Sequence, residues 1–192
     1  MAKDSLNDLV PSNNPSSIDN FTPQIYVVCS ATYKAGKLHG IWINATQNLE
    51  FIDEQIQKML ANCPCPNAKI WTIYDYYRFG SLRPEDIEEV QSMANFITVH
   101  GQLGIALLDF FENLDLAKTT LENHYHGEFK NQLAFATELF VKTHLCDIPE
   151  KLQNYVSINY ATFKRDIFRD EFFLLKVAGK NHVFSFPECP AG

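Results

Sequence analysis

Hydrophobic and polar positions alternate in more than one rhythm along this chain. The stretches "QIYVVCSATY" (24–33) and "LHGIWINA" (38–45) are apolar and rich in β-branched and aromatic residues, which predicts two strands. Residues 34–37, with their glycine, predict a hairpin turn between them. Residues 49–63 then show a helical period, and residues 69–77 predict a third strand. The chain therefore opens with a ββαβ unit, an antiparallel sheet covered by one helix.

After "RFGSLRP" the pattern becomes helical. One face of the next predicted helix carries Ile87, Val90, Ala94 and Ile97, and Pro84 suits its first turn. Residues 101–114 are apolar nearly all round, which predicts a short helix buried among others. Residues 114–127 and 130–145 continue the helical run. The centre of the chain is therefore expected to be helical.

The last part combines one amphipathic helix with a hairpin. Residues 149–168 predict the helix, with an apolar stripe of Leu152, Tyr155, Val156, Asn159, Tyr160, Phe163 and Ile167. Residues 172–186 predict the hairpin, with Ala-Gly-Lys-Asn (178–181) as its turn. Because strands and helices are segregated, the fold class is α+β rather than a parallel α/β sheet. The expected organisation is a flexible leader (1–22), an N-terminal domain (23–80), a central helical domain (81–127) and a C-terminal α+β domain (128–192).

Charge changes this picture more than composition does. Residues 85–128 contain nine acidic residues against one basic residue, Lys118, within a chain of net charge −7. Such a block repels nucleic acid, so direct DNA or RNA binding is not expected. The acidic residues are Glu85, Asp86, Glu88, Glu89, Asp109, Glu112, Asp115, Glu122 and Glu128.

Three interpretations compete for the densest part, "RPEDIEEV" (83–90). Acids in a first helical turn gain about 0.3–1 kcal/mol from the helix dipole, which accounts for one or two of them. The cluster could instead be an acid/base or metal site, or a surface that imitates something anionic. Glu85, Glu88 and Glu89 fall opposite the apolar face of the predicted helix, so all three are expected to be exposed.

Candidate chemistry elsewhere is sparse. Five cysteines, Cys29, Cys63, Cys65, Cys146 and Cys189, match no disulfide framework and predict free thiols in a reducing cytoplasm. The tightest histidine group is His124 and His126, which on a helix would point about 200° apart and could not share a metal. No phosphate loop, dinucleotide fingerprint or nucleophile elbow occurs. We therefore expect no catalytic residues, no cofactor and no metal, although a hydrolase using His124 or His126 is a third, weaker hypothesis.

Two segments carry a resemblance to a known family. The first holds Pro23, Tyr26, Val27, Tyr33, Gly36, Leu38, Gly40, Trp42, Ile43, Asn44 and Ala45. The second holds Trp71, Ile73, Asp75, Tyr76, Phe79 and Gly80. In this combination the chain resembles the ArdA-type antirestriction proteins over about residues 23–186.

That resemblance implies an elongated protein of small domains that dimerises through its C-terminal part. It implies a mimic of double-stranded DNA that occupies the DNA-binding groove of type I restriction–modification enzymes, with their specificity and modification subunits as partners. The nine acidic residues are then the expected partner-binding surface, in a cytoplasmic protein of mobile genetic elements that performs no reaction. The alternative is an acidic regulatory protein of the same fold that binds another basic DNA-binding partner.

Overall fold

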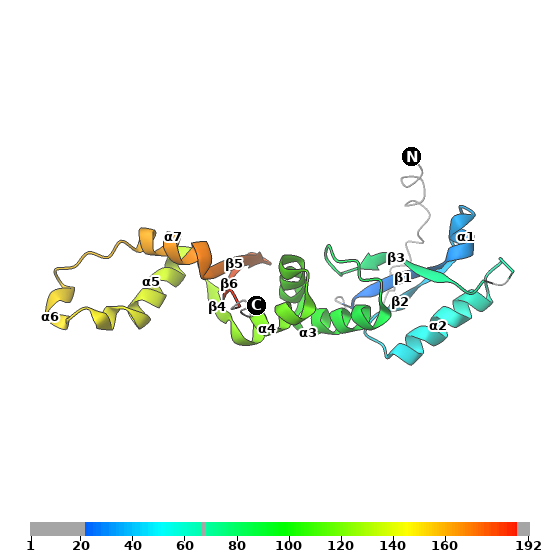
Figure 1. Cartoon of the computed structure of the whole chain (residues 1–192), viewed down its shortest axis with the longest axis horizontal. Coiled ribbons are helices and arrows are strands. Elements are labelled where there is room, and N and C mark those ends of the chain that lie inside the picture. Colours follow the sequence, from blue (N-terminus) through cyan, green and yellow to red (C-terminus); the bar gives the residue numbers. More distant parts are fainter. Residues whose placement is uncertain (1–21, 67, 188–192) are drawn as a thin grey trace, which may run out of the picture. The chain divides into compact units, whose positions relative to one another are not determined.

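The structure is a computed structural model that describes residues 22–66 and 68–187, and the chain divides into two compact units between Ile105 and Ala106. It contains helices α1–α7 and two three-stranded antiparallel sheets, one in each unit (Figure 1). The predicted α+β class is confirmed, with a sheet first, helices in the middle, and a helix followed by a hairpin at the end. The predicted leader, 1–22, lies outside the described residues except for Thr22.

Three strands form the sheet of the first unit. They are β1 (Gln24–Cys29), β2 (Gly40–Asn44) and β3 (Trp71–Tyr77), in the order β2-β1-β3. Every residue of β1 is buried, because this strand lies between the other two and under a helix. The three predicted strands and the predicted helix between the second and third of them are confirmed, and the central strand is the one with the longest apolar run.

Helix α2 (Leu49–Ala61) covers this sheet. It begins at Asn48, whose side-chain oxygen accepts a hydrogen bond from the N–H of Phe51 at 2.8 Å. Its buried face is the periodic one of the sequence, Ile52, Ile56, Met59 and Leu60. Local capping and hydrophobic period therefore agree on this element.

One prediction about this unit is wrong. Strand β1 ends at Cys29 rather than Tyr33, and residues Ser30–Lys34 form a short helix, α1. The N–H of Lys37 bonds to the carbonyl of Thr32 at 2.9 Å, and Gly36 has a φ of +73° that suits glycine. The connection from β1 to β2 is therefore a helical turn and a loop, not a tight hairpin.

The residues that carry the family resemblance serve packing in this unit. A Cβ on Gly40 would lie 2.3 Å from the carbonyl oxygen of Val27, so only glycine fits where β2 meets β1. The rings of Tyr26 and Trp42 lie 5.2 Å apart, and Phe79 is almost fully buried. These positions specify the fold and contain none of the nine acidic residues.

Helix α3 (Ile87–Phe111) contains a break at Gly101, which has φ +59° and ψ −138°. The sequence predicted separate helices on either side of this point, and the two helical segments are present. Val90, Ala94 and Ile97 are fully buried and Ile87 partly, as the helical period predicted. Glycine accommodates the break because it carries no Cβ.

The second unit contains the other sheet, in the order β4-β6-β5. Its strands are β4 (Tyr125–Phe129), β5 (Phe172–Val177) and β6 (Lys180–Ser185). Its helices are the end of α3, α4 (Leu114–Asn123), α5 (Gln132–Thr143), α6 (Glu150–Gln153) and α7 (Tyr160–Asp170), with a 3₁₀ turn at Leu145–Asp147. Its core includes a cluster of Phe135, Ala136, Ile167, Phe172 and Val183.

Three predictions about this unit are corrected. Residues 125–129 form strand β4, although the end of the expected helix 114–127 covered the first three of them, because β6 offers them an open edge to pair with. The stretch 149–168 is not one helix: α6 ends at Gln153 and α7 starts after Asn159, which caps it by accepting from the N–H of Thr162. The hairpin turn is Ala178-Gly179 alone, both with positive φ, so Lys180 and Asn181 belong to β6.

No helix in residues 22–66 and 68–187 combines the length and apolar character that a membrane span needs.

Candidate acidic interaction surface

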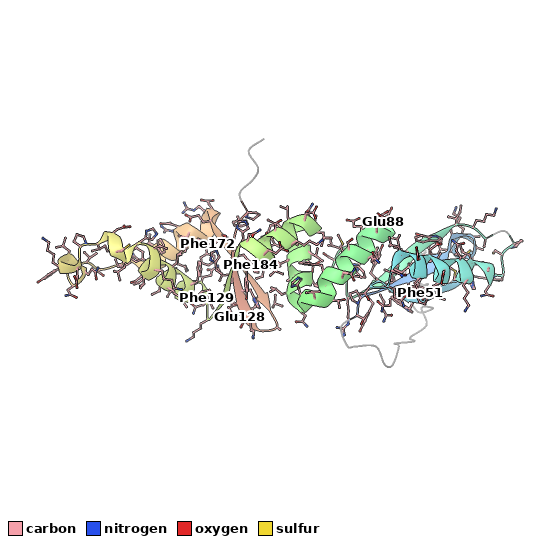
Figure 2. The ribbon with its side chains drawn as sticks, turned by 90° about the horizontal axis from the view of Figure 1, so that it is seen from below. Phe51, Glu88, Glu128, Phe129, Phe172 and Phe184 are labelled. Carbon is pink, nitrogen blue, oxygen red and sulfur yellow. The ribbon has the colours of Figure 1, made fainter. Side chains whose placement is uncertain are left out.

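Four of the nine candidate acidic residues belong to the first unit and lie where α3 begins. Asp86 caps the helix: its Oδ1 accepts hydrogen bonds from the N–H groups of Glu88 at 2.9 Å and Glu89 at 3.0 Å. All four are exposed, and Figure 2 shows Glu88 on the first turn of the helix. The structure therefore brings Glu85, Asp86, Glu88 and Glu89 together on one exposed helix start.

The cation closest in sequence does not neutralise this cluster. Arg83 donates hydrogen bonds to the carbonyls of Gly80 at 2.8 Å and Leu82 at 2.6 Å, and its guanidinium lies 5.2 Å from the centroid of the Tyr76 ring. The Tyr76 hydroxyl in turn donates to the carbonyl of Pro84 at 2.5 Å, which fixes the loop before α3. Arginine is thus held by carbonyls and a ring rather than by the carboxylates.

The electrostatic field of the cluster is visible at the Tyr76 phenol. Burial raises the pKa of Tyr76, Arg83 opposes the rise, and the negative charges of Glu85 and Glu89 add to it. Two carboxylates of the cluster, Glu85 and Glu89, therefore oppose ionisation of the Tyr76 phenol.

The second unit carries the other five acidic residues, and all five are exposed. Asp109 and Glu112 lie at the end of α3, and Glu112 has a positive φ of 51°. Asp115 and Glu122 lie in the first and last turns of α4. Glu128 lies on β4 (Figure 2).

Position along the helices separates two kinds of acid. Asp86, Glu88, Glu89 and Asp115 lie at helix N-termini, where the dipole favours negative charge. Asp109, Glu112 and Glu122 lie at C-terminal ends, where the dipole disfavours it, and neither α3 nor α4 has a basic residue in its last turn. Helix stability therefore explains the first group and does not explain the second.

One of the nine acidic residues, Glu128, forms an ion pair with a lysine. Lys180 on β6 contacts Glu128 at 2.9 Å, so this carboxylate is partly neutralised. Within residues 22–66 and 68–187, no lysine or arginine forms an ion pair with Glu85, Asp86, Glu88, Glu89, Glu112, Asp115 or Glu122. Sequence reasoning missed Lys180 because the pairing of β4 with β6 depends on a strand that it had predicted as helix.

His124 and His126 are placed differently from the helical expectation. His124 follows the last residue of α4 and His126 lies on β4, and both rings contact the hydroxyl of Ser185, at 3.1 and 3.2 Å. The helical geometry from which we argued against a shared metal is therefore wrong. Within the described part of the chain, no group of three or more His, Cys, Asp or Glu side chains is arranged to hold a metal ion.

Comparison with known proteins identifies the family. No curated protein matches the chain. The model of the family described as antirestriction protein (ArdA) matches residues 25–178, which is most of the sequence and includes every residue of the two motif segments except Pro23. The chain therefore belongs to the ArdA family of antirestriction proteins.

Proposed function

We propose that this protein inhibits a type I restriction–modification enzyme by mimicking double-stranded DNA and occupying its DNA-binding groove. Family membership supports the antirestriction role. The observation that supports mimicry is that exposed acids without an ion pair to lysine or arginine in residues 22–66 and 68–187 include Glu122, at the C-terminal end of a helix. Acids at helix C-terminal ends lower the stability of their own helices, so a role in binding accounts for them better than a role in folding.

The physical basis is charge density. B-DNA presents one negative charge per about 1.7 Å of its axis, and proteins that bind it supply Lys and Arg and release counterions. Carboxylates held on helices can occupy the positions at which the Lys and Arg side chains of such a protein would otherwise bind phosphates. Binding should therefore weaken as the salt concentration rises, as it does for DNA itself.

Mimicry requires no reaction. We propose that the protein acts in the cytoplasm by occupancy alone, without a cofactor, and that its partners are the specificity and modification subunits. We expect the acidic surface to comprise the nine exposed carboxylates, with Glu128 contributing least because Lys180 contacts it.

We also propose that the protein is a homodimer formed through residues 128–192. One exposed face of α5 forms an open groove of about 600 Å³, lined on its apolar part by Leu133, Ala134 and Val141. Leu152 in α6, and Tyr155 and Val156 between α6 and α7, are also exposed, Tyr155 by 86%. A second copy would cover this apolar surface, and two-fold symmetry would double the number of acids presented.

Substitution of α5 tests the dimer. Changing Leu133 and Val141 to Asp should convert a dimer to a monomer in light scattering after size-exclusion chromatography. Thr137→Asp on the polar part of the same groove is the matched control for added charge, since Glu138 and Lys142 already make that part polar. A wild-type monomer at all concentrations, or a dimer that survives both apolar changes, would contradict the proposed interface.

A plating assay tests the function as a whole. Unmodified phage is plated on a strain with an active type I restriction system, with and without expression of this chain. We expect plating to rise towards the level seen on a restriction-deficient strain. Unchanged plating at comparable expression on several type I systems, together with recovery of a different basic DNA-binding protein in pull-downs, would favour the alternative regulatory function instead.

A further inference from the structure

Two thiols of the first unit lie in contact although they are 34 positions apart in the sequence. Cys29 is the last residue of β1, and Cys63 follows the end of α2. The Cys63 thiol donates a hydrogen bond to the Cys29 sulfur, with 3.2 Å between the two Sγ atoms. A disulfide needs about 2.05 Å, so the sulfurs are little more than 1 Å from bonding distance.

The surroundings of the two sulfurs differ. Cys29 is fully buried, and Cys63 is only partly buried. Burial raises the pKa of Cys29, but hydrogen bonds from the N–H of Thr32, from the Cys63 thiol and from the N–H of Ala31 lower it, and the net shift is downward. Burial raises the pKa of Cys63, so its thiol keeps the proton that it shares with Cys29. The pair therefore combines an accessible thiol with a buried sulfur that is polarised to act as a nucleophile.

We propose that Cys29 and Cys63 are a site of reversible oxidative modification and form an intramolecular disulfide with hydrogen peroxide as the oxidant. This inference does not depend on DNA mimicry. Its basis is the direct contact of the two sulfurs, the access to one of them, and the polar contacts that surround the other.

The chemistry balances in two steps. The Cys29 thiol, whose pKa is lowered, first loses its proton to solvent. The partly exposed Cys63 sulfur then attacks one peroxide oxygen and gives its proton to the Cys29 thiolate, which yields a sulfenic acid on Cys63 and releases hydroxide, and this hydroxide takes up the first proton to form water. The Cys29 sulfur then attacks the Cys63 sulfur, its proton leaves, and a second hydroxide departs. Two thiols and one hydrogen peroxide thus become one disulfide and two waters, with the thiols oxidised and the peroxide reduced.

Closing this bond would join the end of the central strand to the end of α2. Because α2 packs on the sheet without any other covalent tie, the bond would restrict the unfolded chain between the two positions and raise the unfolding midpoint of this unit. Cys65 is the natural competitor, since its N–H donates to the Cys63 sulfur.

The test uses the full chain with Cys146→Ser and Cys189→Ser, which leaves the three cysteines of the first unit. The reduced protein is treated with a small excess of hydrogen peroxide, and thiols are counted after denaturation. We expect two of three thiols to be lost, a mass lower by two hydrogens, recovery with dithiothreitol, and a peptide linking Cys29 to Cys63. Oxidation should also raise the unfolding midpoint.

Cys65→Ser is the matched control and should keep the whole response. Cys63→Ser should abolish both the linked peptide and the shift of the unfolding midpoint. Because this position is only partly buried, the variant should keep its fold, which circular dichroism of the variant checks. A Cys63–Cys65 link would overturn the proposal. The proposal would also be overturned if Cys63 were oxidised only to the sulfenic or sulfinic acid while Cys29 remained a free thiol.

Discussion

Replacing Glu122 by Gln removes one negative charge from the last turn of α4, where the helix dipole disfavours it and no basic residue compensates. A charge of this kind at an exposed helix end is worth about 0.3–1 kcal/mol at low ionic strength. The variant should therefore be more stable than the wild type by about that amount. For a unit of this size the unfolding midpoint should rise by about 1–8 °C.

The same substitution should weaken inhibition. One exposed charge pair contributes about 0.2–1 kcal/mol to binding, which corresponds to a loss of about 1.5–5-fold in affinity for the restriction enzyme. Stability and inhibition should thus move in opposite directions in a single variant. Thermal unfolding at low salt, paired with an inhibition titration of purified type I enzyme, measures both.

Asp115→Asn provides the matched control within the same helix. Asp115 lies in the first turn of α4, where the dipole favours its charge, so its loss should lower stability while it also weakens inhibition. The two variants change net charge equally. If both shift stability in the same direction, or if neither alters inhibition, the separation of acids by helix end is wrong.

Other predictions concern stability. Asp86→Asn should keep the cap of α3 and its stability within a few tenths of a kcal/mol, whereas Asp86→Ala should cost about 1 kcal/mol in chemical denaturation; equal losses would refute the cap. Burial lowers the pKa of His182 below its usual 6.5, which Glu128 opposes and Lys180 assists. The neutral ring's contribution to stability is therefore complete above about pH 6.5 and is lost as the pH falls through the lower folded-state pKa. His182→Gln should flatten this acid dependence in pH-resolved denaturation, and an unchanged profile would exclude His182 as its source. Gly40→Ala should prevent β2 from pairing, since its Cβ would lie 2.3 Å from a backbone oxygen, whereas Gly36→Asn, with open space and φ +73°, should fold by circular dichroism.

Sequence reasoning succeeded where the residues of one element are sufficient to specify its structure. Helix α2 has a cap at Asn48, a regular apolar face and an end before "PCP", and the observed bounds fall within two residues of the expected ones. The break at Gly101 was likewise indicated by the change in pattern there.

Sequence reasoning failed where the structure of one segment depends on a segment far away in the sequence. Strand β4 forms because β6 lies beside it, and Gly127, with φ +113°, could not belong to a regular helix. The break between α6 and α7 did leave a local signal: Asn159 caps α7 through Thr162, and an N-cap inside a proposed helix indicates a new start.

The acidic residues show the same division. Their exposure could be predicted, because the apolar face of α3 fixes which side of the helix faces solvent. The contact of Lys180 with Glu128 could not be predicted, since it depends on the register of β4 with β6. The position of Arg83 over Tyr76, away from the carboxylates, also depends on tertiary packing.

The most direct test of DNA mimicry is the affinity for a type I modification enzyme as a function of salt. The test variant neutralises Glu85, Glu88, Glu89, Asp109 and Glu112 as Gln or Asn. The control neutralises five exposed acids outside the proposed surface and outside the α5 groove, Glu50, Asp53, Glu54, Glu150 and Glu171, so both variants change net charge equally. We predict that the test variant binds at least about tenfold more weakly with a shallower salt dependence, while the control resembles the wild type. Equal binding by all three proteins, or equal losses in both variants, would contradict the claim that these particular carboxylates stand in for phosphates.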